Sequence, residues 1–125
     1  MENYTSMRYN SKRYRMRIYK TKLFAKWANQ ENISDGELLT TVNDMQRGLV
    51  EVSLGGYLYK KRVSIGGKGK RSGARVIVAY APPDKSFFIY GFSKNEIENI
   101  TIKRLDALKK LAKQLISPDF RTFPQ

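Results

Sequence analysis

The chain has 125 residues, of which 41% are hydrophobic, so it can form one domain with a modest core. Lys and Arg number 24 against 11 Asp and Glu, and this formal net charge of +13 makes nucleic acid or an acidic protein the expected partner, with an anionic membrane the weaker option. The absence of cysteine and histidine excludes disulfides, zinc fingers, iron–sulfur sites and imidazole catalysis, which leaves Lys, Arg, Tyr, Asp and Glu for any chemistry.

The amino-terminal segment has little to bury. Residues 1–15 are poor in aliphatic side chains and rich in Tyr, Arg, Asn and Ser, and we expect a basic, flexible extension there. The folded domain is expected over residues 16–117, followed by a tail at residues 118–125. No apolar run approaches the roughly 20 residues of a membrane helix, and the amino terminus lacks the apolar core of a signal peptide, so we expect a cytosolic protein.

The first half of the domain predicts one strand and a helical hairpin. Residues 16–20 have the pattern of a short strand, and Thr21 is a suitable cap for a helix with one apolar face after it. Ser34, with Glu37 three residues later, has the capping-box pattern that begins a second helix. Apolar side chains, Leu49 among them, recur at helical spacing in this second helix, which we expect to terminate in the region of Gly48.

The second half predicts a β-meander and a final helix. Three short β-rich runs follow one another, at residues 57–65, 74–81 and 86–92. The last helix follows Thr101 and stops before Pro118. The resulting order β-α-α-β-β-β-α indicates the α+β class, with the helices packed on one face of an antiparallel sheet and the other face open.

Basic side chains concentrate on the meander. Because side chains alternate along a strand, Lys60 and Arg62 point to the same face, and Arg75 opens the next strand. The glycine-rich loop between these two strands adds three cations, Lys68, Lys70 and Arg71. Crowding like charges costs free energy that a polyanionic partner would return, so the stretch predicts a phosphate-binding surface, with a solvated hairpin tip as the alternative.

Three motifs follow one another in this half of the chain. The first runs from Gly55-Gly56 to Lys61-Arg62-Val63, the second is Gly67-Lys68-Gly69-Lys70-Arg71 with Arg75, and the third is Phe87-Phe88, Tyr90-Gly91-Phe92 and Lys94-Asn95-Glu96. With the Leu-, Lys- and Ala-rich helix after them, they resemble the RelE/HigB-type toxins of bacterial type II toxin–antitoxin systems. The resemblance covers residues 16–116.

The resemblance implies a RelE-like fold and a toxin without a cofactor. Such a toxin is a metal-independent endoribonuclease, an mRNA interferase that inhibits translation by cutting mRNA, generally at the ribosomal A site. Its implied partners are mRNA, the ribosome and a cognate antitoxin, often a helix-turn-helix protein, and its implied location is the cytoplasm.

The resemblance also assigns residues. The strand basic pair of the family falls on Lys60 and Arg62, its arginine at the start of the next strand on Arg75, and its late basic residue on Lys94. Relatives cut RNA with Lys, Arg and sometimes Tyr, and Tyr90 joins the expected catalytic set. The expected RNA-binding residues are Lys68, Lys70, Arg71, Phe92 and Asn95. Many RelE members have an arginine where this chain has Asn95 and a tyrosine near the carboxyl terminus, whereas no tyrosine follows Tyr90 here.

Transesterification of RNA needs a base for the 2′-hydroxyl, positive charge for the phosphorane oxygens, and an acid for the 5′-oxygen. A lysine crowded by like charges releases its proton more readily, so Lys60 and Lys94 are both candidates for the base. Arg62 and Arg75 stay protonated and suit the phosphate. Two alternatives stay open: a ParE-like toxin that inhibits gyrase, and a non-enzymatic basic module that only binds nucleic acid.

Overall fold

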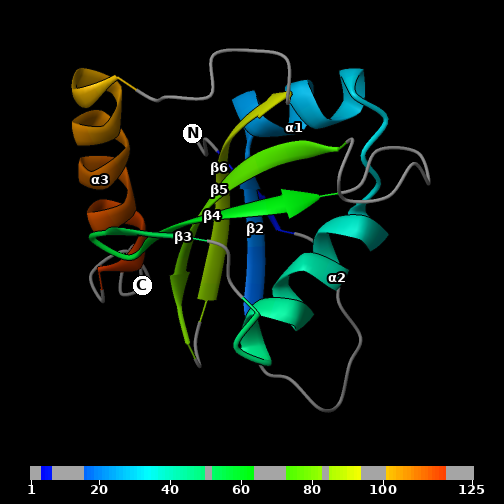
Figure 1. The fold of residues 1–125 in the computed structure, drawn as a ribbon, viewed down its shortest axis with the longest axis horizontal. Helices are drawn as coiled ribbons and strands as arrows, with labels where there is room; N and C mark the ends of the chain where they lie inside the picture. Colours follow the sequence, from blue (N-terminus) through cyan, green and yellow to red (C-terminus); the bar gives the residue numbers. More distant parts are fainter. Residues whose placement is uncertain are drawn as a thin grey trace.

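The computed structural model of the chain describes residues 4–6, 16–49, 52–63, 73–82, 85–93 and 101–117. Within these ranges the elements are, in chain order, β1 (Tyr4–Ser6), β2 (Arg17–Thr21), α1 (Lys22–Gln30), α2 (Asp35–Gln46), β3 (Val52–Gly55), β4 (Leu58–Val63), β5 (Ala74–Ala81), β6 (Lys85–Ser93) and α3 (Ile102–Ile116), as Figure 1 shows. Helices packed on a mostly antiparallel sheet confirm the α+β class predicted from the sequence.

The strands form one sheet in the order β1-β2-β6-β5-β4-β3. Neighbouring strands are antiparallel except β2 and β6, which are parallel. Since a tight turn cannot join parallel strands, the chain between β2 and β6 passes through α1, α2 and three other strands before it returns. The predicted meander corresponds to β4, β5 and β6, and it brings β5 and β6 to the middle of the sheet.

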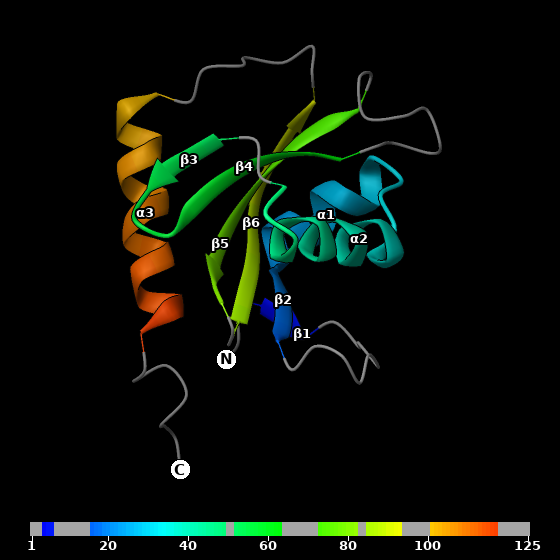
Figure 2. The same cartoon turned by 60° about the horizontal axis from the view of Figure 1, so that its bottom comes forward.

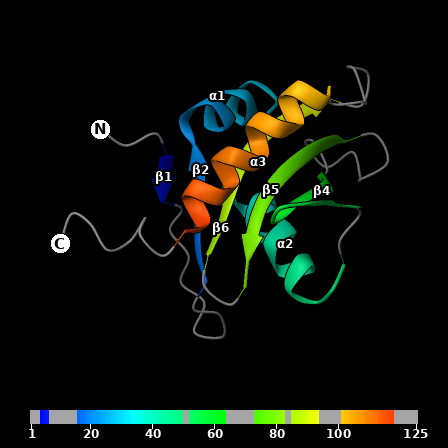
Figure 3. The same cartoon turned by 90° about the vertical axis from the view of Figure 1, so that its left-hand side faces the viewer.

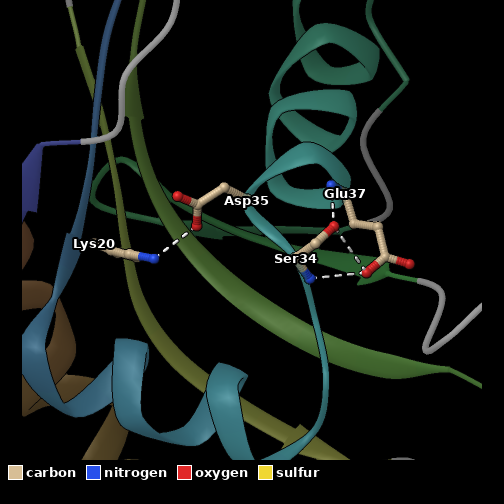
Figure 4. Close-up of polar contacts among 4 residues, drawn as sticks. All are labelled: Lys20, Ser34, Asp35 and Glu37. Atoms are coloured by element: carbon tan, nitrogen blue, oxygen red, sulfur yellow. Dashed lines mark hydrogen bonds and ion pairs between the residues drawn. The ribbon is translucent and has the colours of Figure 1, made fainter.

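The two predicted caps begin their helices. At α1, the amide of Phe24 donates to Oγ1 of Thr21 over 3.1 Å. At α2, the amide of Glu37 donates to Oγ of Ser34 over 3.2 Å, while the amide of Ser34 donates to Oε1 of Glu37 over 2.9 Å, as Figure 4 shows. Both bonds of a capping box are therefore present.

The second helix ends in the Gly48 region, as predicted. Its last residue is Gln46, and Gly48 follows with a φ of 85°, a left-handed conformation that glycine adopts without a steric penalty and that terminates helices. Leu49, which was expected on the apolar stripe of this helix, lies outside it and is exposed. None of the helices in the described ranges is long and apolar enough to span a membrane.

Helices cover both faces of the sheet, which corrects the prediction that they pack on one face and leave the other open. One core joins α1 and α2 to Val76 and Val78, and a second core joins α3 to Ile77 and Ala79. Figure 2 shows α3 on one side of the sheet and α1 and α2 on the other, and in Figure 3 α3 crosses in front of β5 and β6. All residues of β5 from Val76 to Tyr80 are apolar or aromatic and buried, so each face of the strand needs a cover.

The outer strands β1 and β3 were not predicted. β3 pairs with β4 at one edge, and β1 pairs with β2 at the other. Tyr4 of β1 packs edge-on against Tyr19 and Phe87, with ring centroids 5.2 and 5.7 Å away. This contact explains why part of the segment expected to be a flexible extension is a strand. The remainder of that segment and the tail after Ser117 lie outside the described residues.

Candidate nucleic-acid interface

Five of the predicted site residues lie together on the α3 side of the sheet. Directly opposite residues on neighbouring antiparallel strands share a face. One cross-strand row joins Arg62, Arg75 and Phe92, and the adjacent row joins Lys60, Ile77 and Tyr90. We call Lys60, Arg62 and Arg75 the cationic strip, and Tyr90 and Phe92 the aromatic pair. The strip thus spans β4 and β5, and the aromatic pair borders it on β6.

The cationic strip lies at the solvent-open end of this face. Along β4, Leu58 is fully buried in the α3-side core, Lys60 is half-buried and Arg62 is exposed. Arg75, opposite Arg62, is half-buried. The third helix therefore covers one end of the face and leaves the end with the strip accessible to a ligand.

Arg62 and Arg75 are like charges directly opposite one another, an arrangement that costs about 0.2–1 kcal/mol in a sheet. Between Val52 and Pro83 the sequence contains no Asp or Glu. Both arginines also make contacts within the protein, which restrict their side chains. A phosphate bound between them would turn the unfavourable pairing into a favourable one.

The aromatic pair has one member packed in the core and one at the surface. The Tyr90 and Phe92 rings lie 6.1 Å apart, tilted by 39°. Phe92 is only 4% exposed and belongs to the α3-side core, so it has little surface left for the predicted contact with an RNA base. Tyr90 is half-buried, and the guanidinium carbon of Arg104 lies over its ring, 4.9 Å from the centroid. Tyr90 is therefore the member of the pair that can meet a ligand.

A groove of about 830 Å³ opens beside the aromatic pair, between α1 and α3. Its walls are mostly apolar and include Trp27, Leu108 and Leu23, whose side chain is 82% exposed. Tyr90 and Arg104 also line it, so the groove reaches the exposed member of the aromatic pair.

The sequence of residues 16–121 matches the family described as the RelE toxin of the RelE/RelB toxin–antitoxin system. The chain belongs to the RelE toxin family. The resemblance noted in the sequence over residues 16–116 is thereby confirmed, and the chain is a RelE-family toxin of a type II toxin–antitoxin system. A comparison with curated proteins finds no match.

Five further predicted residues of this RelE-family toxin lie outside the described ranges. They are Lys68, Lys70 and Arg71 in the loop between β4 and β5, and Lys94 and Asn95 after β6. The loop follows β4, which ends one residue after Arg62, and the second segment follows β6, which ends one residue after Phe92. Both segments therefore begin at the end of the sheet that carries the row of Arg62, Arg75 and Phe92. Their roles stay predictions.

The acidic residues of α2 have structural partners. Asp35 accepts from Nζ of Lys20 over 2.6 Å, tying α2 to β2, and Glu37 completes the capping box (Figure 4). Asp44 lies 4.0 Å from Nη1 of Arg47. In the described ranges, no group of three or more acidic side chains is placed to hold a metal ion. The RelE-family toxin therefore uses these carboxylates for a helix cap and for ion pairs.

Arg104 is the residue of this interface that the sequence analysis missed. The sequence analysis assigned no role to it or to the other basic residues of the last helix. Which of those cations approaches the sheet depends on how α3 packs, and the local sequence pattern does not determine that packing.

Proposed function

We propose that this RelE-family toxin is an endoribonuclease that cuts mRNA on the ribosome and so inhibits translation. The observation that carries the proposal is the cross-strand alignment of Lys60, Arg62 and Arg75 at the accessible end of one sheet face, with Tyr90 beside them. Three cations and a half-buried aromatic ring on a rigid sheet suit the binding of one phosphate and a neighbouring base.

The proposed reaction is attack of the 2′-oxygen on the adjacent phosphorus, with cleavage of the bond to the 5′-oxygen. A base accepts the 2′-hydroxyl proton and an acid supplies a proton to the leaving 5′-oxygen, which yields a 2′,3′-cyclic phosphate and a free 5′-hydroxyl. Arg62 and Arg75 neutralise the two non-bridging oxygens, whose negative charge grows in the transition state. Lys60 is the candidate base among the described residues, and Lys94 is the second candidate.

Side-chain cations supply the positive charge in this scheme, so it needs no metal ion. Arginine suits the phosphate contacts because its guanidinium stays protonated and presents donors in a fixed plane. Removing a single such donor in comparable sites slows the chemical step about 10²- to 10³-fold.

The proposed partners follow from the same charge. A protein of net charge +13 with an accessible cationic strip is attracted to the ribosome and its RNA in the cytoplasm. The strip is equally complementary to an acidic segment of a cognate antitoxin, which we propose as the regulator of the activity.

Primer extension on cellular mRNA after brief induction of the toxin tests the proposal. New 5′ ends that fall at fixed positions within translated codons are the expected result. DNA damage signalling without new mRNA ends would instead indicate a ParE-like inhibitor of gyrase. Growth arrest with neither signal would leave a module that binds nucleic acid without cutting it.

A further inference from the structure

We infer that Arg104 on α3 is a positioning residue of the RNA site: it holds the ring of Tyr90, and the two together form the platform on which the base next to the bound phosphate stacks. The inference rests on the proposed function and adds a residue that the third helix contributes.

The contact itself is specific. The guanidinium carbon of Arg104 lies 4.9 Å from the centroid of the Tyr90 ring, within the range of a cation–π interaction. A planar guanidinium can stack on an aromatic face, which an ammonium group cannot do. Tyr90 is opposite Ile77, in the same cross-strand row as Lys60, so this contact lies at the end of the row that begins with the strip.

The fold directs Arg104 to this position. Thr101 caps α3, and its Oγ1 accepts from the amide of Arg104 over 3.1 Å, which fixes the first turn. One position along, Leu105 packs against the α3-side core with Leu108. The rotation of the helix about its axis is therefore set, and Arg104 falls at the edge of the helix beside β6.

Stability alone does not account for an arginine here. Arg104 is exposed, and an exposed cation–π contact contributes little to folding. A further cation on the face that carries Lys60, Arg62 and Arg75 adds to the positive charge there in the free protein. Both features become favourable when a polyanion is bound, because the cation then faces phosphate and the ring faces a base.

The ligand class is single-stranded RNA. Stacking on Tyr90 and Arg104 needs an unpaired base, since a base within a duplex has both faces covered. The groove of about 830 Å³ that Tyr90 and Arg104 line leaves room for that base against the two side chains.

The test measures the affinity of the full chain for a labelled, 2′-O-methylated single-stranded RNA by fluorescence anisotropy at several salt concentrations. Arg104→Ala should bind about tenfold more weakly than wild type, through the lost stacking and charge. Arg104→Lys should keep the salt dependence but recover only part of the affinity, because charge remains and planar stacking does not. Arg47→Ala is the matched control, since it removes an exposed arginine from α2 on the other side of the sheet.

A double-mutant cycle distinguishes positioning from simple charge. In a Tyr90→Ala background, Arg104→Ala should weaken binding by less than about twofold, because its partner ring is gone. Fully additive losses, or an Arg104→Ala variant that binds like Arg47→Ala, would overturn the inference while leaving the proposed function intact. Wild-type protein that shows no salt-dependent binding to the RNA would count against the proposed function itself.

Discussion

Replacing Gly91 with alanine tests how the sheet holds the aromatic pair in place. Gly91 lies between Tyr90 and Phe92 on β6. The indole of Trp27 occupies the space where a side chain at Gly91 would lie. A methyl group at Gly91 would lie 2.6 Å from Cη2 of Trp27 and closer still to its Cζ3 and Cε3 atoms. Ring atoms cannot approach a methyl group so closely, so either α1 or the indole must move.

The expected loss is about 2 kcal/mol in the free energy of unfolding. Forcing extra volume into a packed site costs about 1–3 kcal/mol, and the close approach of three indole atoms puts Gly91 at the upper end of that range. The smaller entropy of an alanine in the unfolded chain returns up to about 1 kcal/mol. Trp27 is the chain's one tryptophan, so urea unfolding followed by its fluorescence reports on this contact directly.

The control is the same substitution in a Trp27→Leu background, followed by circular dichroism. There the cost of Gly91→Ala should fall below about 1 kcal/mol, because the smaller side chain leaves room for the methyl group. An equal cost in both backgrounds would show that the indole does not lie on Gly91 and would refute the packing described for α1 and β6.

Three further outcomes are expected. Lys85 is 2% exposed and its Nζ donates over 3.4 Å to the carbonyl of Ser117 at the end of α3, so Lys85→Ala should lower the free energy of unfolding by about 1–3 kcal/mol in urea titrations. Burial raises the pKa of the Tyr80 phenol above 10.0, and nearby Tyr59 adds to the effect. Because the phenol ionises more readily in the unfolded chain, the free energy of unfolding should be constant below about pH 10 and fall as the pH rises above it. Tyr80→Phe should flatten this decline in urea titrations at pH 8 to 11. The loop between β4 and β5 carries three cations, Lys68, Lys70 and Arg71. Their triple alanine variant should reduce the slope of log affinity for RNA against log salt by about 2, and an unchanged slope would make the loop a solvated turn.

Local signals in the sequence were enough for the parts of the fold that depend on neighbours in the chain. The caps at Thr21 and Ser34 and the capping box with Glu37 are present as predicted, since each depends on residues three positions apart. Alternation along β4 placed Lys60 and Arg62 on one face, because the side-chain period of a strand is two residues.

Features that depend on distant residues were missed. Strand β1 is stabilised by Tyr4 against Tyr19 and Phe87, a contact between three separate strands. That helices cover both faces of the sheet could have been predicted from the sequence, because the run from Val76 to Tyr80 lacks the polar alternation of a half-exposed strand. The position of Arg104 over Tyr90 follows from the packing of α3, which only the assembled fold specifies.

The central claim is that the cationic strip cuts RNA, and its most direct test compares Arg75→Ala with Arg47→Ala. The rate of mRNA cleavage in a translating extract and the thermal midpoint of unfolding are measured for both variants and the wild type. Arg75→Ala should lose cleavage about 10²-fold or more with its midpoint nearly unchanged, since it removes charge from the transition state and also relieves its repulsion with Arg62, while Arg47→Ala should keep the wild-type rate. An Arg75→Ala variant that still cuts mRNA at the wild-type rate, or that loses cleavage only by unfolding, would contradict the assignment.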